Sequence, residues 1–409
     1  MISKVYTGRF TVRIGVKGQA EGIRSKYRSV SKNLNPTNMK KTVFILILLI
    51  VSCKSPNNET SESKSTELEQ FEINIDSIIN KSIHADEPGI ALLIAYDGKM
   101  LIGKGYGIRN LETKEPITQS TNIEMASVSK QFTALAILSL VNDGKISLND
   151  TVYKYLPYKS FENVTIKQLI THTSGLEDAE EAFSTEWDST KIATNDDVLK
   201  WYSAENRNKN NISQIFEYNN GAYEVLPIIV EKVSGKKYED YIKENVFEKA
   251  GMKRTVAFNL NSPVDIDERA FYYHKDSLSK WNKMDGHPLT GLLGAGGIYT
   301  SVDDYFNYDN ALRNNSIFSK EIHQLIFEKN DSIKADRSFN SDMSYAKGWF
   351  VNDSIAEHSG GWFGVNTYTK RHLKKPLTIA LFGNRDDVST DLISKIDSIS
   401  VQFMNKNYR

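Results

Sequence analysis

The stretch Ala126-Ser127-Val128-Ser129-Lys130 places a serine and a lysine three positions apart at the start of a run rich in Ala and Leu. The run continues to Asn142 and stops at Asp143-Gly144, which predicts a helix from about Ala126 to Asn142. Positions i and i+3 share a helix face, so the Ser127 hydroxyl and the Lys130 amine can approach each other. A serine is a good nucleophile only when a neighbouring base takes its proton, and a partly desolvated lysine can be that base. Alone, this pattern is weak evidence for catalysis, because Ser127 could simply cap the helix.

Strands are predicted near both ends of the chain and helices between them. Strands are expected at residues 89–96 and 100–106, joined by a turn at Asp97-Gly98, and again at 348–351, 365–369 and 377–382. Helices are expected at residues 71–83, 166–171, 221–233 and 391–403. This order favours an α/β (α+β) fold with one antiparallel sheet built from both termini and flanked by helices. A mostly helical lobe, residues 145–345, would be inserted in the middle.

Two further motifs carry groups suited to acyl transfer. Tyr218 and Asn220 are two positions apart in an extended loop, so a phenol for proton transfer and an amide for substrate binding could face one cleft. By itself, a packed tyrosine in a turn explains this motif better. In His358-Ser359-Gly360-Gly361, the paired glycines let the backbone approach a ligand, and Gly361 could donate its N–H to an oxyanion. A lone histidine beside two glycines is more often structural.

In order and spacing, the three motifs together resemble the serine β-lactamase and penicillin-binding protein family. The resemblance is to the class C β-lactamase and D-alanyl-D-alanine carboxypeptidase branch, which has S-x-x-K, then Y-x-N, then K-T-G or H-x-G. Four further runs resemble family segments: 165–176, 233–235, 250–252 and 294–301. The resemblance covers residues 71–405 and implies a β-lactamase/transpeptidase-like fold.

The resemblance also implies a role for each motif residue. Ser127 would be the acylated nucleophile, and Lys130 and Tyr218 would share the general-base role. Which of these two takes the first proton stays open, because coupled groups titrate as a pair. Asn220, His358, Ser359 and Gly360 would bind substrate, and the backbone N–H groups of Ser127 and Gly361 would form the oxyanion hole.

His358 departs from typical β-lactamases, which have a lysine at this position. Histidine is charged only in part at neutral pH, so it is a weaker partner for a substrate carboxylate. We therefore predict a serine hydrolase that forms an acyl-enzyme on Ser127 and cleaves an amide, peptide or ester bond. The alternatives are a true class C β-lactamase and a non-catalytic, penicillin-binding-like sensor of cell-wall fragments. No cofactor or metal is predicted, and His172 is expected to be a structural loop residue.

The N-terminal region predicts export and lipid anchoring. Met39-Lys40-Lys41 precedes the apolar run from Val43 to Val51, which is too short to span a bilayer and is typical of a signal peptide. The run ends in Ile50-Val51-Ser52-Cys53, which resembles the bacterial lipobox, and Cys53 is the only cysteine. The alternative is an ordinary signal peptide with a chance cysteine.

These features divide the chain into four parts. Residues 1–38 would lie upstream of the true start at Met39, and residues 39–52 would be a lipoprotein signal peptide. Residues 53–70 are polar and would form a flexible tether, lipid-anchored through Cys53. Residues 71–405 would be the hydrolase domain. The predicted location is the bacterial cell envelope, on a membrane that faces the periplasm or the cell surface.

Charge gives no support to nucleic-acid binding. Residues 1–52 hold ten Lys and Arg but one acid, Glu21. Removing these from the 51 basic and 51 acidic residues of the chain leaves 41 and 50, a balance of −9. The expected partners are a small-molecule or peptide substrate and, through Cys53, a membrane. The sequence gives no prediction of the oligomeric state.

Overall fold

The computed structural model describes residues 56–209, 215–329 and 343–408. The chain divides into two units, residues 1–61 and residues 62–409. Of the first unit only residues 56–61 are described, and they are helical. The predictions for residues 1–38, for the signal peptide at 39–52 and for Cys53 lie outside the described residues. Within the described ranges, none of the helices has the length and apolar character needed to cross a bilayer.

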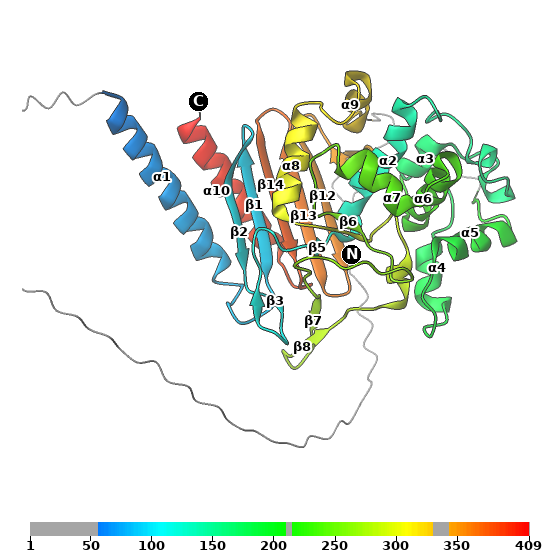
Figure 1. Cartoon of the computed structure of the whole chain (residues 1–409), viewed down its shortest axis with the longest axis horizontal. Helices are drawn as coiled ribbons and strands as arrows, with labels where there is room; N and C mark the ends of the chain where they lie inside the picture. Colours follow the sequence, from blue (N-terminus) through cyan, green and yellow to red (C-terminus); the bar gives the residue numbers. More distant parts are fainter. Residues whose placement is uncertain (1–55, 210–214, 330–342, 409) are drawn as a thin grey trace, which may run out of the picture. The chain divides into compact units, whose positions relative to one another are not determined.

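One antiparallel sheet organises the second unit (Figure 1). Its seven strands, in spatial order, are β10 (Ser344–Tyr345), β11 (Phe350–Val351), β12 (Ile355–Trp362), β13 (Val365–His372), β14 (Leu377–Gly383), β1 (Ile90–Tyr96) and β2 (Lys99–Tyr106). β1 pairs with β14 from Ile90↔Gly383 to Tyr96↔Leu377, which joins the two ends of the domain. The predicted antiparallel sheet built from both termini is therefore confirmed.

The sheet separates two hydrophobic cores, because successive side chains of a strand point to opposite faces. On β1, Ile90, Leu92 and Ile94 pack with α1 (Pro56–Ile79) and α10 (Thr390–Asn407). The alternate residues Ala91, Leu93 and Ala95 belong to the larger core, which includes α2 (Lys130–Asn142) and α8 (Val302–Arg313). Because both faces of β1 are covered, its sequence is a continuous apolar run and not an alternating one.

Most of the remaining elements lie in the inserted, mostly helical lobe, and β3, β4, β5 and η1 precede it in the sequence. The helices are α3 (Ile166–Ile170), α4 (Ala179–Glu186), α5 (Asn195–Ala204), α6 (Asn220–Ser234), α7 (Tyr238–Ile242) and α9 (Lys320–Ile326). The shorter helical turns are η1 (Ala126–Ser129), η2 (Val152–Lys154), η3 (Lys159–Phe161), η4 (Lys243–Phe247) and η5 (Pro288–Gly291). The short strands are β3 (Ile108–Asn110), β4 (Glu115–Pro116), β5 (Ile123–Glu124), β6 (Val256–Ala257), β7 (Tyr273–Lys275), β8 (Trp281–Lys283) and β9 (Ile298–Thr300).

The first helix begins earlier than its sequence pattern indicates. A helix was expected from Phe71, after a flexible tether over residues 53–70, but α1 begins at Pro56. The tether prediction is therefore wrong from Pro56 onward. Proline is favoured in the first turn of a helix, and the Glu, Lys and Gln that follow are good helix formers. Leu68, within α1, also packs against the hydrophobic core between this helix and the sheet. The polar composition of residues 53–70 does not reveal this contact.

Candidate active site

Ser127 lies in η1, the 3-10 turn that directly precedes α2. The regular helix was expected from Ala126 but begins at Lys130. Ala126 has a φ of +45°, a conformation that is strained for a residue with a Cβ. Its N–H donates a hydrogen bond to Oε2 of buried Glu124 at 2.8 Å, while Oε1 accepts the N–H of Gly297 at 3.0 Å. Glu124 therefore holds the turn that presents the serine, and burial raises the pKa of its carboxyl to about 7.

Lys130 is fully buried and joins the serine to the neighbouring helix α6. Its Nζ donates hydrogen bonds to Ser127 Oγ at 3.1 Å, to Asn220 Oδ1 at 2.7 Å and to the Ala295 carbonyl at 3.0 Å. Three acceptors satisfy all the donors of an ammonium group. The structure thus brings together the Ser127–Lys130 pair and Asn220, which lie 90 residues apart in the sequence.

Tyr218 completes this group from the loop before α6. The ring centre of Tyr218 lies 5.0 Å from Lys130 Nζ. The Tyr218 ring also packs against the ring of His172, and the two ring centres lie 4.3 Å apart. Nδ1 of buried His172 accepts the backbone N–H of Asn219 at 3.1 Å, so His172 supports the loop that carries Tyr218 and Asn220.

His358, on β12, is buried and uncharged. Burial, together with the nearby Lys130 charge, lowers the pKa of His358 to about 3. The neutral ring therefore donates its Nδ1 proton to the Ser359 carbonyl at 2.6 Å and accepts the Tyr345 hydroxyl proton at Nε2 at 3.0 Å. The expectation of a partly charged imidazole at this position is wrong, because sequence did not reveal that the ring is enclosed.

The residues after His358 have unequal roles. Gly361 lines the same cavity as Ser127, as expected for the second oxyanion-hole donor. Gly360 is buried, and a Cβ there would lie 2.6 Å from the Met125 carbonyl oxygen, so glycine lets β12 approach the residues before Ser127. Ser359 is exposed. Neither Ser359 nor Gly360 lines the cavity, so the structure does not place these two predicted substrate-binding residues in it.

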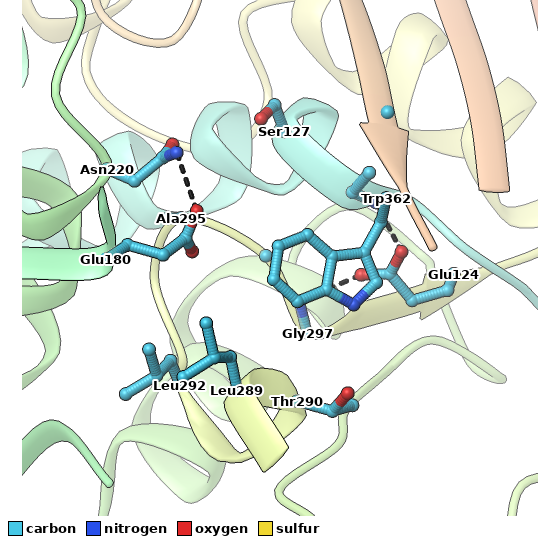
Figure 2. Close-up of a pocket in the computed structure, with 13 residues that line it drawn as sticks. Glu124, Ser127, Glu180, Asn220, Leu289, Thr290, Leu292, Ala295, Gly297 and Trp362 are labelled. Carbon is cyan, nitrogen blue, oxygen red and sulfur yellow. Dashed lines mark hydrogen bonds between the residues drawn. The ribbon is translucent and has the colours of Figure 1, made fainter. Parts of the chain in front are cut away.

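Figure 2 shows the cavity below Ser127. Its apolar wall consists of Leu289, Leu292 and Trp362, and two carboxyl groups, from Glu124 and Glu180, also line it. The aromatic residues at positions 187, 201 and 271–273 do not line it.

Two acidic residues that the sequence analysis missed hold the Tyr218-Asn220 loop in place. The Asp178 carboxylate caps α4 by accepting the Glu180 N–H at 3.0 Å. It also accepts the N–H groups of Asn220 at 2.8 Å and Gly221 at 2.9 Å. Glu180 Oε1 accepts Asn220 Nδ2–H at 2.8 Å. An acid before a helix is a recognisable cap signal, but nothing in the sequence connects this cap to α6.

Among the described residues, no three His, Cys, Asp or Glu side chains gather in a way that could hold a metal ion.

Comparison with known proteins places this arrangement in a family. The family model described as Beta-lactamase matches residues 75–400. The chain belongs to the β-lactamase family. As a member, it is a β-lactamase-related serine hydrolase with the mixed α/β fold of that family.

Individual relatives agree with the assignment. Penicillin-binding protein 4* of Bacillus subtilis is 32% identical over 317 residues, which are 72% of this chain and 68% of the relative. A penicillin-binding protein homologue from Pyrococcus abyssi, described as octameric, has a TM-score of 0.69 at 27% identity, over 83% of this chain and 77% of that one. A D-amino acid amidase from Ochrobactrum anthropi has a TM-score of 0.70 at 20% identity, over 83% and 100%, and shows the shared fold.

Proposed function

We propose that this β-lactamase-family chain hydrolyses amide bonds through an acyl-enzyme on Ser127. The observation that carries the proposal is the contact of Lys130 Nζ with both Ser127 Oγ and Asn220 Oδ1, at 3.1 and 2.7 Å. A serine with a buried amine at hydrogen-bond distance, next to a cavity, is the arrangement that nucleophilic catalysis requires.

In the first half-reaction, Ser127 Oγ attacks the substrate carbonyl carbon and passes its proton to the Lys130–Tyr218 pair. The negative charge on the carbonyl oxygen would be stabilised by the backbone N–H groups of Ser127 and Gly361. When the C–N bond breaks, the proton moves from the pair to the leaving nitrogen. The amine departs and the acyl group stays on Ser127.

In the second half-reaction, water attacks the acyl carbonyl carbon and gives one proton to the same pair. The bond between the carbonyl carbon and Ser127 Oγ then breaks, and the proton returns to Oγ. The products are the free acid and the starting enzyme, so no cofactor is consumed.

The electrostatics of the site favour this function over dedicated β-lactam hydrolysis. A β-lactam antibiotic carries a carboxylate that needs a cationic partner. His358 is neutral, because its pKa is lowered to about 3, and no Lys, Arg or His lines the cavity. We therefore rank two alternatives below an amide hydrolase: a true β-lactamase, and a sensor that is acylated without turnover.

Active-site labelling tests the proposal. The full chain and Ser127→Ala are incubated separately with a fluorophosphonate and with labelled penicillin, and the adduct is located by mass spectrometry. We expect a Ser127 adduct and turnover of amide substrates, both absent in Ser127→Ala. An unlabelled Ser127, or amide hydrolysis that survives in Ser127→Ala, would overturn the proposal. A stable adduct without turnover would favour the sensor, and rapid hydrolysis of a chromogenic cephalosporin would favour the β-lactamase.

We also propose that the protein is a lipoprotein of the bacterial cell envelope, anchored through Cys53. The support is the charged and apolar segment at residues 39–52 followed directly by the only cysteine. Expression of the full chain and of Cys53→Ala, followed by membrane fractionation and mass spectrometry of the mature N-terminus, tests this. We expect a lipid-modified Cys53 in the membrane fraction. An unmodified Cys53, or equal membrane association of both chains, would refute the anchor.

A further inference from the structure

The cavity beside Ser127 has acidic side chains and no basic ones. Of the residues that line it, Glu124 and Glu180 carry carboxyl groups, and none is Lys, Arg or His. Glu124 is committed to the backbone, because its two oxygens accept the N–H groups of Ala126 and Gly297. Glu180 is therefore the carboxyl that remains to meet a substrate.

Glu180 is well placed for this contact. In Figure 2 its carboxyl group faces the space between Ser127, above, and the side chains of Leu289 and Leu292. One oxygen accepts Asn220 Nδ2–H at 2.8 Å, and Asn220 in turn contacts Lys130, the partner of Ser127. The carboxyl thus lies next to the groups that would act on the scissile bond, and its position is fixed by Asn220.

A second carboxyl group, that of Glu224, lies next to Glu180. Glu224, on α6, is fully buried, and neither of its side-chain oxygens has an N–H or O–H donor within the described ranges. It faces Glu180, and two carboxyl groups in contact cannot both ionise, so the pair holds a shared proton. Burial raises the pKa of both carboxyl groups, and because the pKa of Glu224 is raised well above its usual value, Glu224 holds the shared proton and Glu180 is the member of the pair that ionises.

No side chain that lines the cavity is a cation that could contact Glu180; the positive charge of Lys130 acts on Glu180 from outside the lining, but Lys130 Nζ donates its hydrogen bonds to Ser127, Asn220 and Ala295. A carboxylate substrate would add a negative charge close to Glu180, and neutral His358 offers no compensation. A substrate cation would instead form a charge-assisted hydrogen bond in a partly desolvated site, where such bonds are strongest. The apolar wall of Leu289, Leu292 and Trp362 could accommodate a hydrophobic side chain of the same substrate.

We propose that Glu180 binds the protonated α-amino group of the acyl donor, so that the preferred substrates are α-amino-acid amides and peptides with a free amino terminus. The nitrogen of an α-ammonium group is two bonds from the scissile carbonyl carbon, so it lies near Ser127 when Ser127 attacks that carbon. Glu180 is also near Ser127, because only Asn220 and Lys130 stand between them in the hydrogen-bond chain. The inference rests on the proposed amide hydrolysis and specifies its substrate class.

Paired substrates test the inference in the full chain without any mutation. The D- and L-forms of leucine p-nitroanilide are compared with their N-acetyl derivatives, which lack the cation. We expect the free amine of at least one enantiomer to have a kcat/KM about 10- to 100-fold above its N-acetyl form. This advantage should disappear as the pH rises through the amine pKa of the substrate, about 7.7–8.0 for an α-amino group. A preference for the N-acetyl forms, or none, would overturn the inference.

Two variants on α4 test whether the preference for free-amine substrates depends on the Glu180 carboxyl group. Glu180→Gln keeps the shape and an acceptor for Asn220 but removes the charge, so the free-amine advantage should be lost. Glu181→Gln changes the neighbouring, exposed carboxyl of the same helix and should keep the advantage. An equal loss on both substrate types in Glu180→Gln would make Glu180 only a support for Asn220 and would overturn the inference.

Fluorophosphonate labelling separates this inference from the proposed function. A labelled Ser127 with no free-amine preference would refute the ammonium site alone. An unlabelled Ser127 and no hydrolysis of either substrate type would refute the proposed function and the inference together. The unmodified chain supplies both measurements, so the outcome does not depend on whether Glu180→Gln folds.

Discussion

The Asp178 carboxylate accepts the backbone N–H of Asn220 at 2.8 Å and thereby ties the start of α4 to the start of α6 beside Ser127. Asp178→Ala would release both helix ends. We expect the free energy of unfolding to fall by about 1–3 kcal/mol, and kcat/KM for an amide to fall by about 10- to 100-fold because Asn220 is displaced. Denaturant unfolding and steady-state kinetics measure the two effects. Asp196→Ala, at an exposed site in the first turn of α5, is the control. Equal behaviour of the two variants would contradict the positioning role.

Lys130→Met should almost abolish acylation of Ser127. Methionine fills a similar volume but leaves the Asn220 Oδ1 and Ala295 carbonyl oxygens without their Lys130 donor. Because general-base catalysis contributes roughly 10²- to 10⁴-fold, we expect a loss of that size in the rate of adduct formation, followed by mass spectrometry. Lys167→Met, at an exposed site on α3, should react like the unmodified chain. Rapid labelling of Lys130→Met would remove Lys130 from the base role.

Burial of neutral His358 should make the fold lose stability in mild acid. The folded pKa, about 3, lies below the usual value of 6.5, so between these two pH values the unfolded chain binds a proton that the folded chain does not. The stabilisation is therefore complete above pH 6.5 and is lost as the pH falls toward 3, at up to about 1.4 kcal/mol per pH unit. Unfolding curves of the unmodified chain and His358→Gln between pH 4 and 8 measure this. The variant should depend less on pH in that window; parallel curves would contradict the assignment.

Glu124→Gln should weaken the turn that presents Ser127. Both carboxyl oxygens of Glu124 accept backbone N–H groups, whereas an amide offers only one acceptor and directs its NH₂ at the other donor. We expect the loss of one buried hydrogen bond to cost about 1–3 kcal/mol of unfolding free energy and to slow the acylation of Ser127. Thermal unfolding and fluorophosphonate labelling rates, with Glu181→Gln as control, test this. Unchanged labelling would show that Ala126 keeps its positive φ without Glu124.

Local sequence predicted the elements of this fold better than its contacts. The turn at Asp97-Gly98 was recognisable because both residues adopt positive φ, +49° and +72°, which Asp and Gly tolerate. The stop of α6 at Gly235 was recognisable for the same reason, with a φ of +71°. The start of α1 was not recognisable from the sequence, because the burial of Leu68 depends on strands far away in the sequence.

The candidate site shows the same limit. Ser127, Lys130, Tyr218 and Asn220 form short motifs whose spacing is visible in the sequence. Asp178 and Glu180 were missed because their partners lie about 40 residues away, at Asn220. The charge of His358 could not be foreseen either, because it depends on enclosure by residues such as Tyr345, on another strand.

The pairing of β1 with β14 has a consequence for how the chain acquires its structure. Ile90 meets Gly383 in the sheet, so a central strand pair closes only when nearly the whole domain is available. Contacts of such high sequence separation are slow to form, and a chain still emerging from the ribosome cannot make them. The early strands β1 and β2 can pair with each other as soon as they are made, but β1 gains its second neighbour, β14, only when synthesis is almost complete, so the seven-stranded sheet forms late.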